Sequence, residues 1–282
     1  MTPTRLIITA DDFGLSPSIN EAVIQAYRLG ILTSTSMVVN GDAFEPAVQL
    51  ARQHPQLQVG LHLNLYRGRP ITEASDIPSL VDRRTGRFLQ SLRRVGWRIT
   101  SGGFQAEDVY TELRAQADRL LAHGIIPTHL DSEKHLHHAP GIRSVVIRLA
   151  KELGVTYVRV VDESLTVLGW LRIALTGSWD KLAAGPVFRS AKREFVAAGL
   201  RVPARSVGFF RPIRRTDLAR ALMAPQEDVV EVICHPGLRS PEDVAQLARH
   251  GRFFVDAARA EELEALLDPR LRARLHGGIA TC

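Results

Sequence analysis

The densest group of metal-binding side chains lies in the segment 129–138, which reads HLDSEKHLHH. It holds four histidines and two carboxylates in ten residues. Imidazole and carboxylate groups together form the ligand sets of divalent metal ions. A solvated polar loop is the alternative, but this concentration of ligand types favours a metal site.

Two adjacent aspartates, Asp11 and Asp12, follow the apolar run 5–10. One of them could cap a helix by accepting hydrogen bonds from free backbone N–H groups. A second carboxylate beside the first is unfavourable unless a cation or a shared proton compensates its charge. A metal ion held by one aspartate, with the other as general base, would explain the pair.

Single histidines in two other apolar runs could belong to the same site. His62 lies between two leucines and is followed by Asn64, and His235 stands in the string CHPG after a buried run. A lone histidine in a strand is more often a hydrogen-bonded core residue than a ligand. His235 could equally be a general acid.

Short apolar runs alternate with helical periodicity along the chain. Gly30 is a plausible stop for the first helix, which follows a Ser-Pro-Ser capping signal. Repeated strand–helix alternation predicts parallel strands and an α/β fold, either an open sheet or a barrel. The predicted strands are 5–10, 36–40, 57–65, 125–130, 155–161 and 229–234, and the later predicted helices are 43–53, 106–123, 140–153, 216–223 and 257–268.

The polar residues named above fall at or near the ends of predicted strands. Ligands of parallel α/β folds bind at the carboxyl ends of the strands, so we expect these side chains to converge on one edge. Two segments, 66–104 and 162–205, interrupt the alternation and are predicted insertions in a single domain that spans residues 1–282.

Composition excludes several classes of protein. The 282 residues are 45% hydrophobic and 23% charged, which is typical of a globular chain and not of a disordered or fibrous one. Two cysteines argue against a disulfide framework. The sequence shows neither a signal-peptide pattern nor a membrane-spanning run, so we expect a cytoplasmic protein.

The net charge is +6, from 36 basic and 30 acidic residues. Aromatic residues are only 6%, and no nucleic-acid-binding module is evident, so we expect no nucleic-acid partner. Residues 165–179 are apolar, contain two tryptophans and precede basic residues. This pattern is typical of an interfacial membrane segment, although packing on the barrel or in a homodimer is the alternative.

Five motifs in order resemble the YdjC-like carbohydrate deacetylases, which include chitooligosaccharide deacetylases and hopanoid-biosynthesis-associated deacetylases. The resemblance covers most of residues 5–160 and 206–270. The motifs are residues 9–16 (TADDFGLS, followed by Asn20), 30–36 (GILTSTS), 60–64 (GLHLN), 127–132 (PTHLDS) and 234–237 (CHPG).

The resemblance implies a single (β/α) barrel-like domain related to the polysaccharide deacetylases. It implies removal of acetyl groups from N-acetylated amino sugars, either oligosaccharides or glycolipids, with a divalent ion such as Mg²⁺ or Zn²⁺. Asp12 and His62 would be metal ligands, Asp11 the general base and His235 the acid. Residues assigned to substrate binding or to support of the ligands are Asn64, His129, Asp131, His135, His137 and Arg159.

One position departs from the family pattern. The family reads Asp-Ser-His where this chain has Glu133 after Asp131 and Ser132. We expect Glu133 to replace the family histidine as the third ligand, and the alternatives are ligation by His135 or His137 or a weak metal site. Two other functions stay open, namely hydrolysis of another amide or ester and sugar or metal binding without catalysis.

Overall fold

The computed structural model describes residues 6–163, 179–223, 229–238, 241–248 and 251–274. Its centre is a parallel sheet in the order β7-β6-β3-β2-β1-β9-β8. β1 is buried along its whole length. The strands span Leu6–Phe13 (β1), Ser34–Met37 (β2), Gln58–Leu63 (β3), His129–Ser132 (β6), Tyr157–Val158 (β7), Arg205–Val207 (β8) and Val230–Cys234 (β9).

The sheet curls until its two edges meet. Arg201, before β8, donates from its backbone N–H to Thr156 and accepts from Val158. Further along, the backbone N–H of Ser206 donates to the carbonyl of Asp162. The chain therefore has the α/β architecture predicted from the strand–helix alternation and the barrel-like form that the family resemblance implies.

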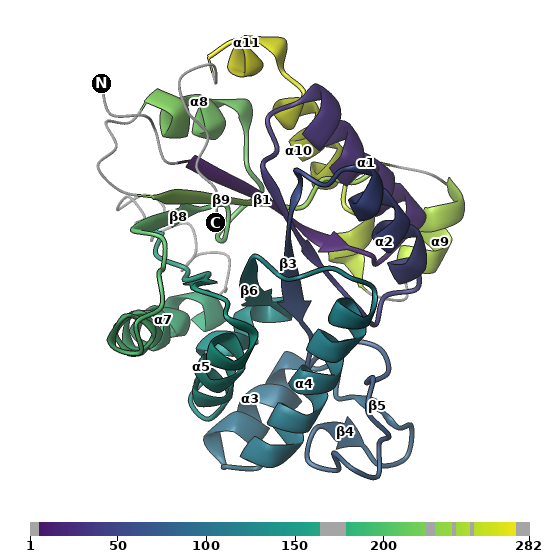
Figure 1. Cartoon of the computed structure of the whole chain (residues 1–282), viewed down its shortest axis with the longest axis vertical. Coiled ribbons are helices and arrows are strands. Elements are labelled where there is room, and N and C mark those ends of the chain that lie inside the picture. The colour runs from purple at the N-terminus through teal and green to yellow at the C-terminus, as the bar shows by residue number, and fades with distance from the viewer. Residues whose placement is uncertain (1–5, 164–178, 224–228, 239–240, 249–250, 275–282) are drawn as a thin grey trace.

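Helices surround the curled sheet (Figure 1). The first of them follows the predicted signals: Ser16 caps it, Pro17 begins it, and Ile19, Val23 and Ala26 turn their side chains to the core. The helices are α1 (Pro17–Leu29), α2 (Phe44–Gln53), α3 (Leu92–Thr100), α4 (Ala106–Ala122), α5 (Ile142–Leu153), α7 (Trp179–Ala197), α8 (Arg215–Met223), α9 (Pro241–Ala248), α10 (Ala258–Leu266) and α11 (Pro269–Arg272), with 3₁₀ turns η1 (Glu133–His138) and η2 (Arg252–Val255).

Two strands lie elsewhere than predicted. β2 begins at Ser34 rather than Ser36. The hydroxyl side chains at its start do not resemble a buried apolar strand, but they can be buried because they bond to backbone oxygens, as Thr35 does to the Ala10 carbonyl. β6 begins at His129 rather than residue 125. Asp131 is consequently a strand residue, paired in register with His62 of β3.

The segment 66–104 contains a two-stranded hairpin, β4 (Val81–Asp82) with β5 (Arg87–Phe88), and then α3. The segment 162–205 contains α7 and ends where β8 begins, so it leads into a strand of the main sheet that the sequence pattern did not indicate. Most of residues 165–179, the predicted interfacial stretch, lie outside the described residues.

Candidate active site

The two aspartates of β1 lie at an irregular stretch of that strand. The pairing with β2 shifts register between Ala10 and Phe13, and Asp12 has a left-handed backbone with φ of 71°. Neighbouring residues of a regular strand point to opposite faces of the sheet. The irregularity instead lets Asp11 and Asp12 approach the same group of side chains. Asp12 achieves this with a backbone conformation that non-glycine residues rarely adopt.

Asp12, His62 and Glu133 form a compact donor set. Their ligand atoms lie within 4.8 Å of one another, and all three residues are buried. They come from β1, β3 and the turn after β6, which are the carboxyl ends of parallel strands. Left-handed backbone at Lys134 and His135 follows Glu133 directly.

A second group, Asp11, His62 and Asp131, meets the same distance criterion. Arg159 already bonds both oxygens of Asp11, at 2.7 and 2.8 Å, and contacts Asp131 at 2.7 Å. In the first group, the arginine contacts engage one oxygen of each carboxylate, Asp12 with Arg259 and Glu133 with Arg67, both at 2.9 Å. The first group is therefore the better metal site.

Asp131 orients His62. The Nδ1–H of His62 donates to Asp131 Oδ1 at 2.8 Å, which leaves Nε2 as the ring nitrogen for a metal ion. This carboxylate–histidine arrangement is common behind metal-bound imidazoles. Burial alone would lower the pKa of His62, but the carboxylates of Asp131, Asp11 and Asp12 raise it to about 9. Metal binding would thus displace a proton from this ring.

His129 supports Asp131 through Ser36. The Ser36 hydroxyl donates to Asp131 Oδ2 at 2.6 Å, so it must accept from His129 Nε2, 3.0 Å away. The ring of His129 lies against Gly60, where an added Cβ would be 2.3 Å from Nε2. Burial lowers the pKa of His129, in agreement with this neutral form.

Arg159 is fully buried and joins three carboxylates. Besides Asp11 and Asp131 it contacts Glu231 Oε1 at 2.8 Å. Burial raises the pKa of Asp11 to about 6 against the opposing effect of the guanidinium. Burial would raise the pKa values of Asp12 and Glu133, but their cationic neighbours together lower them, chiefly Arg259 for Asp12 and Arg67 with Lys134 for Glu133.

His235 lies beside Asp11, as the register of Ala10 with Cys234 requires. Its Nε2 is 3.6 Å from Asp11 Oδ2, and its side chain is 20% exposed. Burial lowers the pKa of His235 to about 3, so the ring is neutral at physiological pH. Glu262 accepts a hydrogen bond from its backbone N–H.

The remaining predicted residues hold neighbours in place. Asn64 bonds Asn40 and the backbone of Arg67, which shapes the loop that delivers Arg67 to Glu133. His137 bonds Ser132 and the carbonyl of Arg159. His135 packs against the ring of Phe209 rather than joining the donor set.

Sequence reasoning missed Arg67, Arg259, Ser36 and Glu231. Glu231 carried a signal, because a carboxylate in a strand as apolar as VVEVIC must be paired. Arg67 and Arg259 carried none, since nothing in their neighbours marks them among 36 basic residues.

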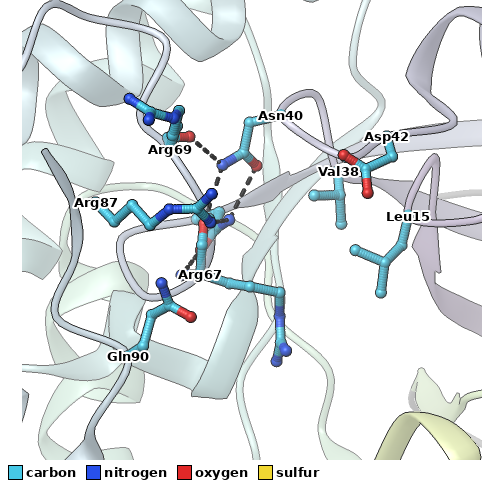
Figure 2. A pocket seen from close by; sticks show the side chains of 11 residues that line it. Leu15, Val38, Asn40, Asp42, Arg67, Arg69, Arg87 and Gln90 are labelled. Atoms are coloured by element: carbon cyan, nitrogen blue, oxygen red, sulfur yellow. Dashed lines mark hydrogen bonds between the residues drawn. The ribbon is translucent and has the colours of Figure 1, made fainter. Parts of the chain in front are cut away.

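A cavity of about 220 Å³ adjoins Arg67. Figure 2 shows polar side chains of the loops after β2 and β3 and the residues around β5 gathered around it. Its lining residues are Leu15, Val38, Asn40, Gly41, Asp42, Asn64, Arg67, Gly68, Arg69, Arg87 and Gln90.

Two proteins similar to this chain are both named carbohydrate deacetylase. A carbohydrate deacetylase of Mus musculus is 34% identical over 300 residues, covering 99% of this chain and 93% of the mouse protein. A carbohydrate deacetylase of Brevibacillus brevis is 43% identical over 148 residues, which span 52% of this chain and only 56% of that relative.

A solved structure has the same fold over the whole chain. It is a protein of Enterococcus faecalis V583 provisionally assigned to cellobiose-phosphate cleavage, with a TM-score of 0.76, 24% identity, and coverage of 100% of this chain and 97% of that one. The family model described as YdjC-like protein matches residues 5–277. Because that match includes every described residue, the chain belongs to the YdjC-like protein family.

Proposed function

We propose that this protein is a metal-dependent hydrolase that removes the acetyl group from an N-acetylated amino sugar. The observation that carries the proposal is the buried donor set of Asp12, His62 and Glu133, with Asp11 and His235 beside it. The relatives named carbohydrate deacetylases support the choice of a sugar substrate.

The donor set fits a divalent ion such as Zn²⁺ or Mg²⁺. Two carboxylates and one neutral imidazole carry a total charge of −2, and both metals accept oxygen ligands. Glu133 occupies the position of the family histidine and supplies one of the three donors. A bound ion would polarise the acetyl carbonyl and make a water molecule more acidic.

Asp11 would act as the general base. Its pKa of about 6 leaves it ionised at neutral pH while keeping it basic enough to accept a proton from water. Arg159 grips both of its oxygens, so the carboxylate is held at a fixed angle. The carboxylate would therefore already be positioned to accept a proton from water, with no side-chain rotamer change needed during the reaction.

His235 would protonate the leaving amine. Because its ring is neutral at physiological pH, it must first receive a proton. Asp11 gains one when water attacks and lies 3.6 Å from His235 Nε2. We infer that His235 takes this proton only transiently, because its pKa of about 3 lies below the value of about 6 for Asp11, and passes it on to the more basic amine nitrogen, which restores both groups for the next cycle.

Substitution of Asp11 tests the assignment. In Asp11→Asn we expect acetate release from N-acetylglucosamine oligosaccharides to fall by about 10²–10⁴-fold, the usual contribution of a general base. Calorimetry should still detect metal binding, because Asp12, His62 and Glu133 are intact. Asp118→Asn, on the exposed side of α4, is the matched control. Deacetylation near the wild-type rate in Asp11→Asn would refute the role.

A further inference from the structure

A basic and partly apolar surface lies in the segment 83–98, here called the arginine-rich surface. Its sixteen residues, RRTGRFLQSLRRVGWR, hold six arginines and no acidic residue. Its charge of +6 equals the net charge of the whole chain, 36 − 30 = +6. The rest of the chain therefore has equal numbers of basic and acidic residues, and the segment 83–98 accounts for the whole excess of positive charge.

Helix α3 forms the apolar part of this surface. Val95 is buried and Ile99 packs on the core, so these residues fix the inner side of the helix. Trp97 lies on the other side and is 67% exposed, and Leu92 at the start of the helix is 47% exposed. Exposed apolar patches that are bordered by polar residues mark protein, ligand or membrane interaction sites.

The arginines surround Trp97. With 100° per residue, Arg93 and Arg94 flank Trp97 on the outward side of the helix. A shallow hollow of about 510 Å³ runs along it, lined by Leu89, Arg93, Arg94, Trp97 and Arg98. Arg94 contacts Asp82 at 2.9 Å, but both side chains stay partly exposed, so this ion pair is weak.

The position of the surface relates it to the candidate active site. The segment leaves the sheet after β3, whose carboxyl end also carries His62. Figure 1 shows α3, β4 and β5 together at the end of the molecule beyond the arrowhead of β3. A partner that binds the arginine-rich surface would therefore lie near the end of the molecule toward which the carboxyl end of β3 points (Figure 1).

We propose that the arginine-rich surface docks this protein on an anionic lipid bilayer. Arginines contact lipid phosphates, and Trp97 enters the headgroup layer, where amphipathic rings are favoured. The protruding Leu92 favours a bilayer over nucleic acid, because a phosphate backbone gains nothing from an aliphatic side chain. Among the helices of the described residues, none combines the length and the hydropathy of a membrane span.

Vesicle co-sedimentation tests the proposal. We expect the full-length protein to bind vesicles of 30% phosphatidylserine in phosphatidylcholine at 0.1 M salt, and not pure phosphatidylcholine vesicles. Each arginine removed should weaken binding about fivefold, so Arg93→Gln/Arg94→Gln should lose about 25-fold. Trp97→Ala leaves the charge unchanged and should also weaken vesicle binding relative to the wild type. Because this contribution is apolar, the loss of binding should persist at 0.3 M salt.

Matched controls lie elsewhere on the protein. Arg28→Gln/Arg270→Gln removes two exposed arginines outside the arginine-rich surface, and Ile126→Ala removes an exposed apolar residue. Both should bind vesicles like the wild type. The proposal is overturned by no binding to anionic vesicles, by equal losses in the controls, or by tight binding to duplex DNA alone. The assay needs no sugar substrate, so its outcome is independent of the proposed reaction.

Discussion

Replacement of Arg159 by methionine is the most demanding test of the buried charge network. The guanidinium is completely buried and lies 2.7 to 2.8 Å from oxygens of Asp11, Asp131 and Glu231. Methionine fills a similar volume without charge. Arg159→Met would therefore leave three carboxylates close together with their main counter-charge gone.

The cost follows from that geometry. Removing one partner of a buried ion pair destabilises a protein by about 3–5 kcal/mol, and here three carboxylates lose the same partner. For a chain of this size we expect Tm to fall by roughly 10 °C. Burial already raises the pKa of Asp11 to about 6 with Arg159 present, so its removal raises that pKa further. Protonation then relieves the repulsion, and the loss should be smaller at pH 5 than at pH 8.

Thermal and urea unfolding at the two pH values measure the effect. Arg94→Met, at a half-exposed arginine paired with Asp82, is the control and should cost at most about 1 kcal/mol. Arg159→Met/Glu231→Gln should recover part of the loss, because one uncompensated charge is gone. A loss below about 1 kcal/mol in Arg159→Met, or no recovery at pH 5, would refute the reasoning.

Two further predictions concern packing and pH. Gly60→Ala should destabilise the fold by about 1–3 kcal/mol, because its Cβ would lie 2.3 Å from the His129 ring. Gly96→Ala in helix α3 has nothing within 4 Å of the added Cβ and should stabilise the fold by up to about 1 kcal/mol. Urea unfolding that gives both changes the same sign would contradict this. Burial raises the pKa of Glu262 from 4.5 to about 7, so the folded state holds this proton more tightly and stability should fall as pH rises from about 4.5 to 7. Glu262→Gln should flatten that part of the Tm profile, and an unchanged slope would show that another group causes it.

Much of the architecture could be predicted from local patterns. The capping signal at Ser16 and the apolar spacing after it specify α1, because helix ends and amphipathic faces depend on neighbouring residues. Strand–helix alternation likewise indicated a parallel sheet whose carboxyl ends collect polar residues. Strand β8 escaped prediction because its three residues, Arg205–Val207, are too short to form a pattern.

The sequence by itself determined which residue types are available for metal binding and roughly where they lie: Asp11 and Asp12 after one apolar run, His62 in another, and Glu133 in a histidine-rich segment. Only the tertiary structure decided which of these side chains are left for a metal ion and which are paired with Arg159. Arg159 engages both oxygens of Asp11 and contacts Asp131, while Arg67 and Arg259 each touch one oxygen of Glu133 and Asp12. Arg67 lies 66 residues from Glu133, and Arg259 lies 247 residues from Asp12. Charge pairing at such separations depends on how the whole sheet curls rather than on any local pattern.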